Sequence, residues 1–393
     1  MTRSLSHVLP PAGWVILAMA LTLTTVGLAA IYTGEADAAT LPAKTLRQAG
    51  LMVAGLAGLV LVQIVGYQRM KQWAYPLYAI VLVLLALLIV ARYLPLDPFI
   101  RARRHAYRWI ILGPMSIQVS DPAKLAYILT LAAYLRFRTS YRRFLGLMTP
   151  FALTLIPVAL ILKEPDLGTS MLLPPTLLVM LFAAGAKMKH LLLVIALGVA
   201  AVPTFYFSPL MTPYQRERIQ VVFRQNDTNR RWRMETGYQL NQSKIALGSG
   251  QVTGRGFREG AFFRYNLLPE EHNDLIFAVI GHQGGLVGCA AVLLCYFIMV
   301  AAGLHIALTI TDPFGRLVAV GVCGMLFAQA AINVGMTIGL MPTTGMSLPF
   351  VSAGGSGLVT SYLAIGLLIS VGRRRPLDVA PRPFEFDGDV DEA

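Results

Sequence analysis

Charged side chains are scarce in this sequence of 393 residues, because Asp, Glu, Lys and Arg together supply only 13% of it. In soluble domains about a quarter of the residues are charged, so this chain has too few charges to cover a surface that faces water. Hydrophobic residues make up 56% of the chain. The composition therefore excludes a water-soluble protein and predicts one that is solvated by lipid.

Cysteine and acidic residues are also few. The three cysteines lie in apolar runs, and their odd number excludes a secreted scaffold held together by disulfides. The 33 Lys and Arg exceed the 20 Asp and Glu, which gives a net charge of +13. In a membrane protein this excess must lie in the loops, where it indicates the orientation of the chain.

Long apolar runs are abundant instead. A membrane-spanning helix needs about 20 mostly apolar residues, and ten such runs occur. They cover residues 14–33, 48–67, 74–93, 119–137, 145–162, 168–185, 189–207, 275–300, 315–339 and 352–371. We therefore predict an all-α polytopic membrane protein with ten transmembrane helices, in which residues 1–375 form a single membrane domain.

The basic residues of the short loops indicate that both termini are cytoplasmic. Cytoplasmic loops are enriched in Lys and Arg, and with ten spans four basic groups fall on one side. These groups lie at 69–71, 136–143, 187–189 and 373–375. Residues 376–393 are rich in proline and acidic side chains, and we predict a disordered cytoplasmic tail there.

Two loops on the opposite, extracytoplasmic side are basic as well. Five arginines lie between spans 3 and 4, and the large loop between spans 7 and 8, about 208–273, contains ten Lys or Arg against six Asp or Glu. This charge would suit an anionic ligand such as a lipid phosphate. It would equally suit ordinary anionic head groups, and the charge alone favours neither interpretation.

Ionisable side chains at the mouth of a helical bundle are the first candidates for function. Asp121 and Lys124 can pair at the i, i+3 spacing, and Asp121 can also cap the helix that follows it. We favour a structural ion pair at the edge of a polar cavity over contact with a ligand. Asp166, between spans 5 and 6, either caps span 6 or belongs to a polar site.

Within the large loop, residues 237–248 predict a short amphipathic helix. Leu240, Ile245 and Leu247 would face the membrane, while Gln242 and Lys244 would point elsewhere.

Glycine-rich turns follow this helix at 248–250 and 254–256. Backbone N–H groups there, beside Arg255 and Arg258, could cradle phosphate oxygens. Glycine also serves turn geometry by itself, which makes this evidence weak.

Asp274 is the last acidic residue before the apolar run of span 8. An acid in this position can cap the helix, and the spacing alone favours capping. Close to the lipid boundary, however, partial desolvation raises the pKa of a carboxyl towards that of a useful general base. Asp274 could also join Glu271 and His272 around a cation. The spacing is not that of a dedicated metal site, so we expect at most Mg²⁺ or Mn²⁺ shared with a substrate pyrophosphate.

Further polar residues lie inside the apolar runs. His282 with Gln283, and Gln329 with Asn333, predict hydrogen bonds between helices. Residues 342–356 contain two prolines and several glycines and cannot form a continuous helix. Irregular backbone at membrane depth is tolerated only where it is buried in protein or lines a wet cavity, so this segment predicts a cavity that is open to the outside.

Taken together, several blocks resemble the SEDS family (shape, elongation, division and sporulation). The blocks are Arg108-Trp109-Ile110 with 117–125, Glu-Pro-Asp-Leu-Gly-Thr-Ser at 164–170, and the segments 242–250, 268–278 and 333–356, in matching order and spacing over about 108–371. The segment 242–250 is more similar to the rod-shape branch of the family than to its division branch. The chain departs from the family pattern at Val119, Asp121, His282-Gln283, Ala353 and Gly357.

This resemblance implies a peptidoglycan glycosyltransferase in the bacterial cytoplasmic membrane with its active site on the extracytoplasmic side. The enzyme would polymerise lipid II into a nascent glycan strand, in contact with membrane lipid and a class B penicillin-binding protein and without nucleic acid. It also implies that Asp274 is the catalytic base, which reverses the capping interpretation.

Eight further residues are expected to bind substrate: Arg108, Asp121, Lys124, Asp166, Gln242, Lys244, Arg255 and Ser352. A lipid II flippase or another membrane carrier is the alternative, and a scaffold for partner proteins is the third hypothesis. A carrier should place its ionisable groups near the middle of the membrane, whereas here they gather on the outer side.

Overall fold

The structure is a computed structural model, and it describes residues 10–34, 43–91, 108–112, 115–137, 144–208, 211–225, 227, 237–257 and 273–373. Each of the ten apolar runs forms a helix. These helices are α1 (Pro11–Gly34), α2 (Ala43–Val65), α3 (Tyr67–Val90), α4 (Ser120–Leu135), α5 (Met148–Lys163), α6 (Leu167–Ala184), α7 (Met188–Phe207), α12 (Ile276–Thr309), α13 (Pro313–Ile338) and α14 (Gly355–Gly372).

Among the described residues, seven of these helices are long and apolar enough to cross a membrane: α1, α2, α3, α6, α12, α13 and α14. The chain is therefore an integral membrane protein. Helices α4 and α5 have 16 residues each, and α7 contains a shorter apolar segment. The count of ten spans stays a prediction.

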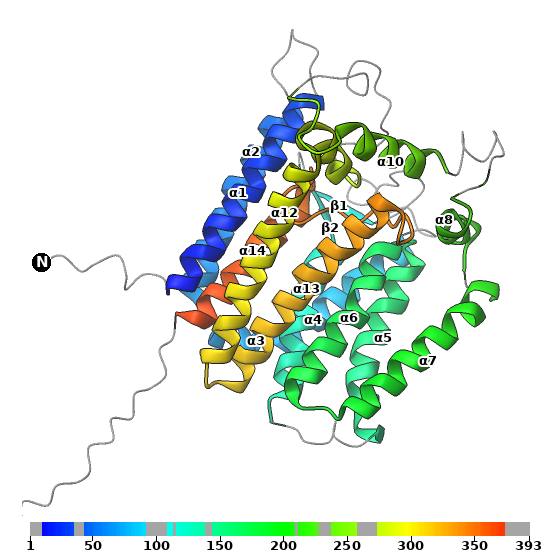
Figure 1. Ribbon diagram of the computed structural model, residues 1–393. Coiled ribbons are helices and arrows are strands. Elements are labelled where there is room, and N and C mark those ends of the chain that lie inside the picture. The colour runs from blue at the N-terminus through cyan, green and yellow to red at the C-terminus, as the bar shows by residue number, and fades with distance from the viewer. Residues whose placement is uncertain are drawn as a thin grey trace, which may run out of the picture.

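Helix α13 forms the centre of the bundle and packs against α4, α6, α12 and α14 (Figure 1). Small residues allow this close packing. A side chain at Gly321 would place its Cβ 2.8 Å from Ile128 of α4 and 2.8 Å from Met180 of α6. Lipid tails are as apolar as leucine, so such helices associate through tight packing and hydrogen bonds rather than through the hydrophobic effect.

The expectation of an all-α fold is wrong in one detail. Strands β1 (Trp109–Leu112) and β2 (Met115–Gln118) form an antiparallel hairpin in which Trp109 pairs with Gln118. Two strands of four residues leave almost no periodic signal in a sequence. The hairpin has a functional consequence, because β2 ends directly before α4 and carries Gln118 into the polar site.

Two helices belong to the large loop: α8 (Pro213–Phe223) and α10 (Tyr238–Gly250). Together with the hairpin they lie at one end of the bundle, and the start of α1 and the end of α14 lie at the opposite end (Figure 1). This arrangement is the one that an even number of spans requires. It gathers the irregular, polar segments at a single end.

Candidate functional site

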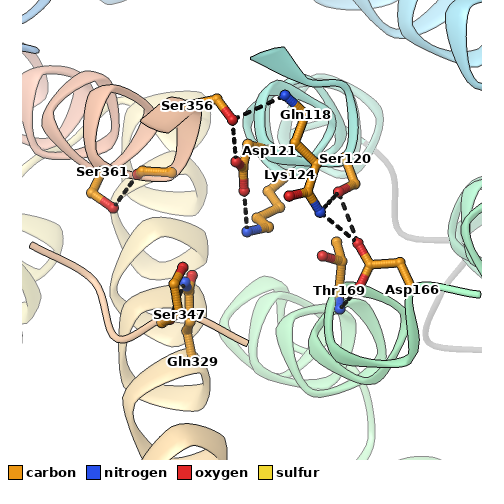
Figure 2. Close-up of polar contacts among 11 residues, drawn as sticks. Gln118, Ser120, Asp121, Lys124, Asp166, Thr169, Gln329, Ser347, Ser356 and Ser361 are labelled. Atoms are coloured by element: carbon orange, nitrogen blue, oxygen red, sulfur yellow. Dashed lines mark hydrogen bonds and ion pairs between the residues drawn. The ribbon is translucent and has the colours of Figure 1, made fainter. Parts of the chain in front are cut away.

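A buried polar cluster lies where α4, α6 and α14 begin, and we call it the α4–α6 cluster (Figure 2). It is formed by Gln118, Ser120, Asp121, Lys124, Asp166, Thr169 and Ser356. Sequence positions more than 200 residues apart meet here, because β2 and the N-termini of three helices converge on one point.

The predicted ion pair is present in this cluster. Lys124 Nζ donates to Asp121 Oδ1 at 2.8 Å, and both side chains are buried. Ser356 Oγ of α14 donates to the other carboxylate oxygen of Asp121 at 2.7 Å. The capping interpretation of Asp121 is wrong, because α4 begins one residue earlier, at Ser120, and no side chain caps it.

Asp166 both caps α6 and belongs to the polar site, so both readings of this residue hold. Its Oδ1 accepts the Thr169 N–H at 3.2 Å, while Oδ2 accepts from Gln118 and Ser120 at 2.9 Å each. Burial works to raise the pKa of this carboxyl. The nearby Arg108 guanidinium, together with Lys124 and the hydrogen bonds, outweighs burial and holds the pKa below its ordinary value.

Glu164, two residues earlier, has the opposite electrostatic environment. Burial, and then the negative charge of Asp166, raise the pKa of Glu164 to about 9, although Arg108 works to lower it. Among the residues that the structure describes, its buried Oε1 has no hydrogen-bond partner, and an unpaired carboxyl in this setting favours the neutral form. Arg108 itself donates to the backbone carbonyls of Glu164, at 2.6 Å, and of Pro165. The structure thus places Arg108 on the α5–α6 connection.

A second polar site surrounds Asp274, and we call it the Asp274 pocket. It is lined by Arg218, Gln239, Asp274, Leu275, Met336, Thr343 and Gly345. The capping interpretation of Asp274 is wrong, because α12 starts at Ile276 with Leu275 at the N-cap position. The pocket combines a carboxylate, a guanidinium and an amide at the mouth of an apolar bundle.

Neighbouring side chains hold the backbone of Asp274 in place. Asn333 of α13 donates to the Asp274 carbonyl at 3.0 Å and to the Met346 carbonyl at 2.7 Å. Ser352 donates to the Asn273 carbonyl at 2.6 Å and accepts from the Leu348 N–H at 2.7 Å. Ser352 is buried and does not line the pocket. Its two hydrogen bonds link residue 273 to the irregular segment.

The irregular segment predicted over 342–356 is confirmed as non-helical for residues 342–354, whereas residues 355 and 356 already belong to α14. The irregular segment lies between the two polar sites. A Cβ at Gly345 would lie 3.2 Å from Asp274 Oδ2, and one at Gly357 would lie 3.4 Å from Ser347 Oγ and 3.6 Å from Asp121 Oδ2. The segment is anchored to α13 by Gln329, which donates to the Ser347 carbonyl at 2.9 Å. The segment therefore lies close to Asp274 at Gly345, and Ser347 and Asp121 both lie near Gly357 of α14.

Arg218 is a pocket residue that the sequence reasoning missed. It lies on α8, where its guanidinium donates to the Thr343 carbonyl and to the Tyr214 hydroxyl and stacks 4.6 Å from the centre of the Tyr214 ring. A signal was available in the sequence. Thr212 and Gln215 form a capping box with Pro213 in the first turn, and this pattern predicts a helix start.

The predicted helix at 237–248 is confirmed as α10, but its orientation differs in part. Leu240, Ser243 and Ala246 form its buried face, so Leu240 packs inside the protein, whereas Ile245 is exposed. The burial of Ser243 is compensated by a 2.8 Å hydrogen bond to the Thr337 carbonyl of α13.

The predicted phosphate cradle is wrong, because its N–H groups are already used. Arg255 N donates to the His282 carbonyl at 2.9 Å, and Gly256 N donates to the Gln283 carbonyl at 3.2 Å. In return, Leu286 N and Val287 N donate to the carbonyls of residues 251 and 252. Helix α12 is broken here at Gly285, whose φ is 61°. The glycine turn therefore supplies hydrogen-bond partners to the backbone groups at the break in α12.

The remaining predicted residues lie around these sites without entering them. Gln242 lies one turn beyond the pocket residue Gln239 on α10. Lys244 is exposed and donates to Gln225, which also bonds the Gly339 carbonyl at 2.6 Å. Arg255 is exposed, with its Nε on the Ser249 carbonyl at 2.8 Å.

The predicted interhelical hydrogen bonds are confirmed for His282 and Gln283, whereas Gln329 and Asn333 bond carbonyls of non-helical residues instead. His282 contacts Ser249 at 2.6 Å, Gln283 donates to Thr33 at 2.6 Å, and Gln329 and Asn333 bond as described above. Glu271 and His272 lie outside the described residues. Within the part of the chain that the structure describes, no three His, Cys, Asp or Glu side chains come together as metal ligands.

The fold and these two sites define a class: an integral membrane protein with a carboxylate and a guanidinium in a pocket at the end of a helical bundle. The family model described as cell cycle protein (FtsW, RodA, SpoVE) matches residues 13–376. The chain belongs to this family, the SEDS family.

Individual relatives agree with this membership. The relative named probable peptidoglycan glycosyltransferase FtsW, of Geobacter metallireducens, is 33% identical over 370 residues, covering 92% of this chain and 94% of the relative. The peptidoglycan glycosyltransferase MrdB of Escherichia coli is 32% identical over 331 residues, covering 84% and 86%. FtsW-named and MrdB-named relatives match almost equally well, so the preference for the rod-shape branch stays a prediction.

A solved structure is similar as well. One chain of a peptidoglycan synthase complex that coordinates polymerization and crosslinking superposes with a TM-score of 0.74 at 29% identity. The match covers 92% of this chain and 97% of the other.

Proposed function

We propose that this chain polymerises lipid II into glycan strands at the outer face of the bacterial cytoplasmic membrane, with Asp274 as the general base. Membership of the family and the two glycosyltransferase relatives support the activity; the chain is a peptidoglycan glycosyltransferase. The observation that carries the assignment of the base is the position of Asp274, which lines a pocket beside a guanidinium.

The reaction transfers one proton, forms one glycosidic bond and breaks the bond between the donor sugar and its pyrophosphate. Asp274 takes the proton from a sugar hydroxyl of the acceptor, and the hydroxyl oxygen forms a bond to the anomeric carbon of the donor. The bond from that carbon to the pyrophosphate breaks, and the lipid pyrophosphate leaves with the electron pair. A single base opposite the leaving group predicts inversion at the anomeric carbon without a covalent intermediate.

The substrate-binding residues expected from the sequence then fall into two groups. Lys244, Gln242 and Arg255 lie on or next to α10 close to the surface, where an anionic lipid-linked sugar can approach them. The other five residues do not line the pocket and would act on it indirectly. Arg108 and Ser352 do so through backbone carbonyls, and Asp121, Lys124 and Asp166 do so through the α4–α6 cluster.

The membrane arrangement and the partners complete the proposal. Ten spans with both termini in the cytoplasm would place the Asp274 pocket outside, opposite the start of α1 and the end of α14. A class B penicillin-binding protein is the proposed partner, supported by the structural likeness to a chain from a peptidoglycan synthase complex. Mg²⁺ or Mn²⁺ would enter only with the substrate pyrophosphate.

The test is polymerisation of purified lipid II by the full-length protein with its cognate class B penicillin-binding protein, with product length read on a gel. We expect polymer from the wild type and none from Asp274→Asn. Asp312→Asn is the matched control, because Asp312 caps α13 through the Phe314 and Gly315 N–H groups and asparagine caps equally well.

Normal polymerisation by Asp274→Asn would remove the base assignment. If neither protein made polymer with the partner present, translocation of lipid II across vesicles would become the next assay, because a flippase would then account better for the fold.

A further inference from the structure

The positive charges of the two polar sites differ in their partners. In the α4–α6 cluster, Lys124 is paired with Asp121 at 2.8 Å, and Arg108 is bonded to the α5–α6 connection beside Asp166. Two cations there face two carboxylates. Little positive charge is left in the cluster for a polyanionic ligand.

Arg218 is different, because its described contacts are neutral. They are the Thr343 carbonyl and the hydroxyl and ring of Tyr214. A guanidinium has five N–H donors, and these contacts use two of them. They also orient the planar group, so less side-chain entropy is lost when it binds a second ligand.

Both the guanidinium and the carboxylate lie close to Gly345. A carbon atom placed as the Cβ of Gly345 would lie 3.2 Å from Asp274 Oδ2 and 3.3 Å from Arg218 Nη1. Both groups line the same pocket, together with Gln239 of α10. The two groups therefore lie near the same backbone position, and a ligand that enters the pocket can contact both of them.

We propose that Arg218 binds the leaving pyrophosphate of the donor, so that the Asp274 pocket holds the reacting centre between base and leaving group. This inference rests on the proposed function. In the reaction, the oxygen that carries the leaving phosphate takes up negative charge as its bond to the anomeric carbon breaks. A preorganised cation stabilises that charge most where water is excluded, and a guanidinium can bind two phosphate oxygens at once.

Geometry favours the pyrophosphate of the donor over that of the acceptor. The base touches the attacking hydroxyl, and the leaving oxygen lies on the far side of the same anomeric carbon. Only the reacting atoms therefore separate the base from the donor pyrophosphate, in keeping with the short gap between Asp274 and Arg218. In lipid II the pyrophosphate of the acceptor is a disaccharide away from its own attacking hydroxyl.

The experiment measures binding of the leaving group itself, which requires no turnover. The full-length protein with its class B penicillin-binding protein is placed in nanodiscs of zwitterionic lipid, where anionic head groups cannot compete. Undecaprenyl pyrophosphate and undecaprenol are titrated against the wild type, Asp274→Asn, Arg218→Gln, Arg218→Lys and Arg224→Gln. Arg224 is the matched control, an exposed arginine at the end of the same helix.

We expect Arg218→Gln to weaken binding of undecaprenyl pyrophosphate by roughly tenfold to a hundredfold, the range for a lost charge-assisted hydrogen bond. Binding of undecaprenol should not change. Arg218→Lys should be intermediate, because lysine keeps the charge and loses the planar fork. Arg224→Gln should bind like the wild type. Asp274→Asn should bind the pyrophosphate at least as tightly, because it removes a negative charge from the pocket. A loss of folding would instead weaken binding of both lipids.

Equal binding of the pyrophosphate by Arg218→Gln and Arg224→Gln, or no binding by the wild type, would overturn the inference. The proposed function is judged separately by polymerisation. If the wild type makes polymer and Asp274→Asn does not, the function stands whatever Arg218 does. If Asp274→Asn makes polymer, the base assignment fails while the binding result still decides the role of Arg218.

Discussion

Single residues set the distance between the two charged groups of the pocket. Gly345 lies between Asp274 and Arg218 and adopts a φ of 75°, which glycine reaches without steric cost. A Cβ here would press on both groups, at 3.2 Å from Asp274 Oδ2 and 3.3 Å from Arg218 Nη1. The catalytic geometry thus depends on a residue with no functional group.

Gly345→Ala should lower the polymerisation rate by about tenfold or more, because displacing reacting groups by a fraction of an ångström is costly. It should also lower the free energy of unfolding by about 1–2 kcal/mol, the cost of the left-handed backbone for a residue with a Cβ. Gly66→Ala is the control, since Gly66 has the same φ of 75° with nothing within 4 Å. Equal activity of the two variants would contradict this role of Gly345.

Glu164 makes stability depend on pH. Its pKa is raised from 4.5 to about 9, mainly by burial, so the folded protein keeps the proton at a pH where the unfolded chain releases it. This contribution to stability is therefore complete below about pH 4.5 and is lost as the pH rises towards 9.

Glu164→Gln should remove this dependence. We expect the variant to be more stable than the wild type at neutral pH, and their difference to grow between pH 5 and 9 by at most about 1.4 kcal/mol per pH unit. Melting temperatures in detergent across this range measure it. A difference that stays constant with pH would show that Glu164 ionises normally.

At the scale of the secondary-structure elements, backbone hydrogen bonds connect the end of α10 to α12. Residues 251–256 pair with the break at Gly285, and Gly250 packs directly on α12. Buried backbone groups in a broken helix must find partners, and the glycines allow a second backbone close enough to supply them. Because α10 carries Gln239 and α12 begins beside Asp274, this junction sets the position of one wall of the pocket.

Two glycines on α10 provide a matched pair for testing this junction. A Cβ at Gly250 would lie 1.9 Å from the Gly281 carbonyl, whereas a Cβ at Gly248 would meet nothing within 4 Å. We expect Gly250→Ala to lower both the melting temperature and the polymerisation rate, and Gly248→Ala to keep the rate and to raise stability by up to about 1 kcal/mol. Similar behaviour of the two variants would mean that α10 is not docked on α12 in this way.

The molecule as a whole has its polar sites at the end opposite the start of α1 and the end of α14. The orientation proposed from the basic loops makes that end extracytoplasmic. Two exposed positions, Gly248 on α10 and Lys187 between α6 and α7, lie at opposite ends of the bundle.

Single cysteines at these positions test the orientation. A membrane-impermeant maleimide added to intact cells should label Gly248→Cys, and it should label Lys187→Cys only after the membrane is permeabilised. The wild type measures the background, because Cys289 and Cys323 are buried and Cys295 is partly buried. The reverse pattern would invert the topology and place the Asp274 pocket in the cytoplasm.

The sequence by itself determined the membrane environment, the ten apolar helices and the choice of Asp274, Lys124 and Asp166 as candidate site residues. These features follow from composition, from runs of about 20 residues and from short motifs, all of which are local in the chain. The Asp121–Lys124 pair was accessible for the same reason, since three residues separate its members.

Only the tertiary structure decided which of these groups meet. Arg218 reaches Asp274 from a helix 56 positions earlier in the chain, and Ser356 reaches Asp121 across more than 200 residues. The glycine turn looked like a phosphate cradle because its sequence shows donors but not their partners, which lie in the break of α12. Hydrogen-bond partners and distances across the bundle depend on packing, and no local pattern encodes them.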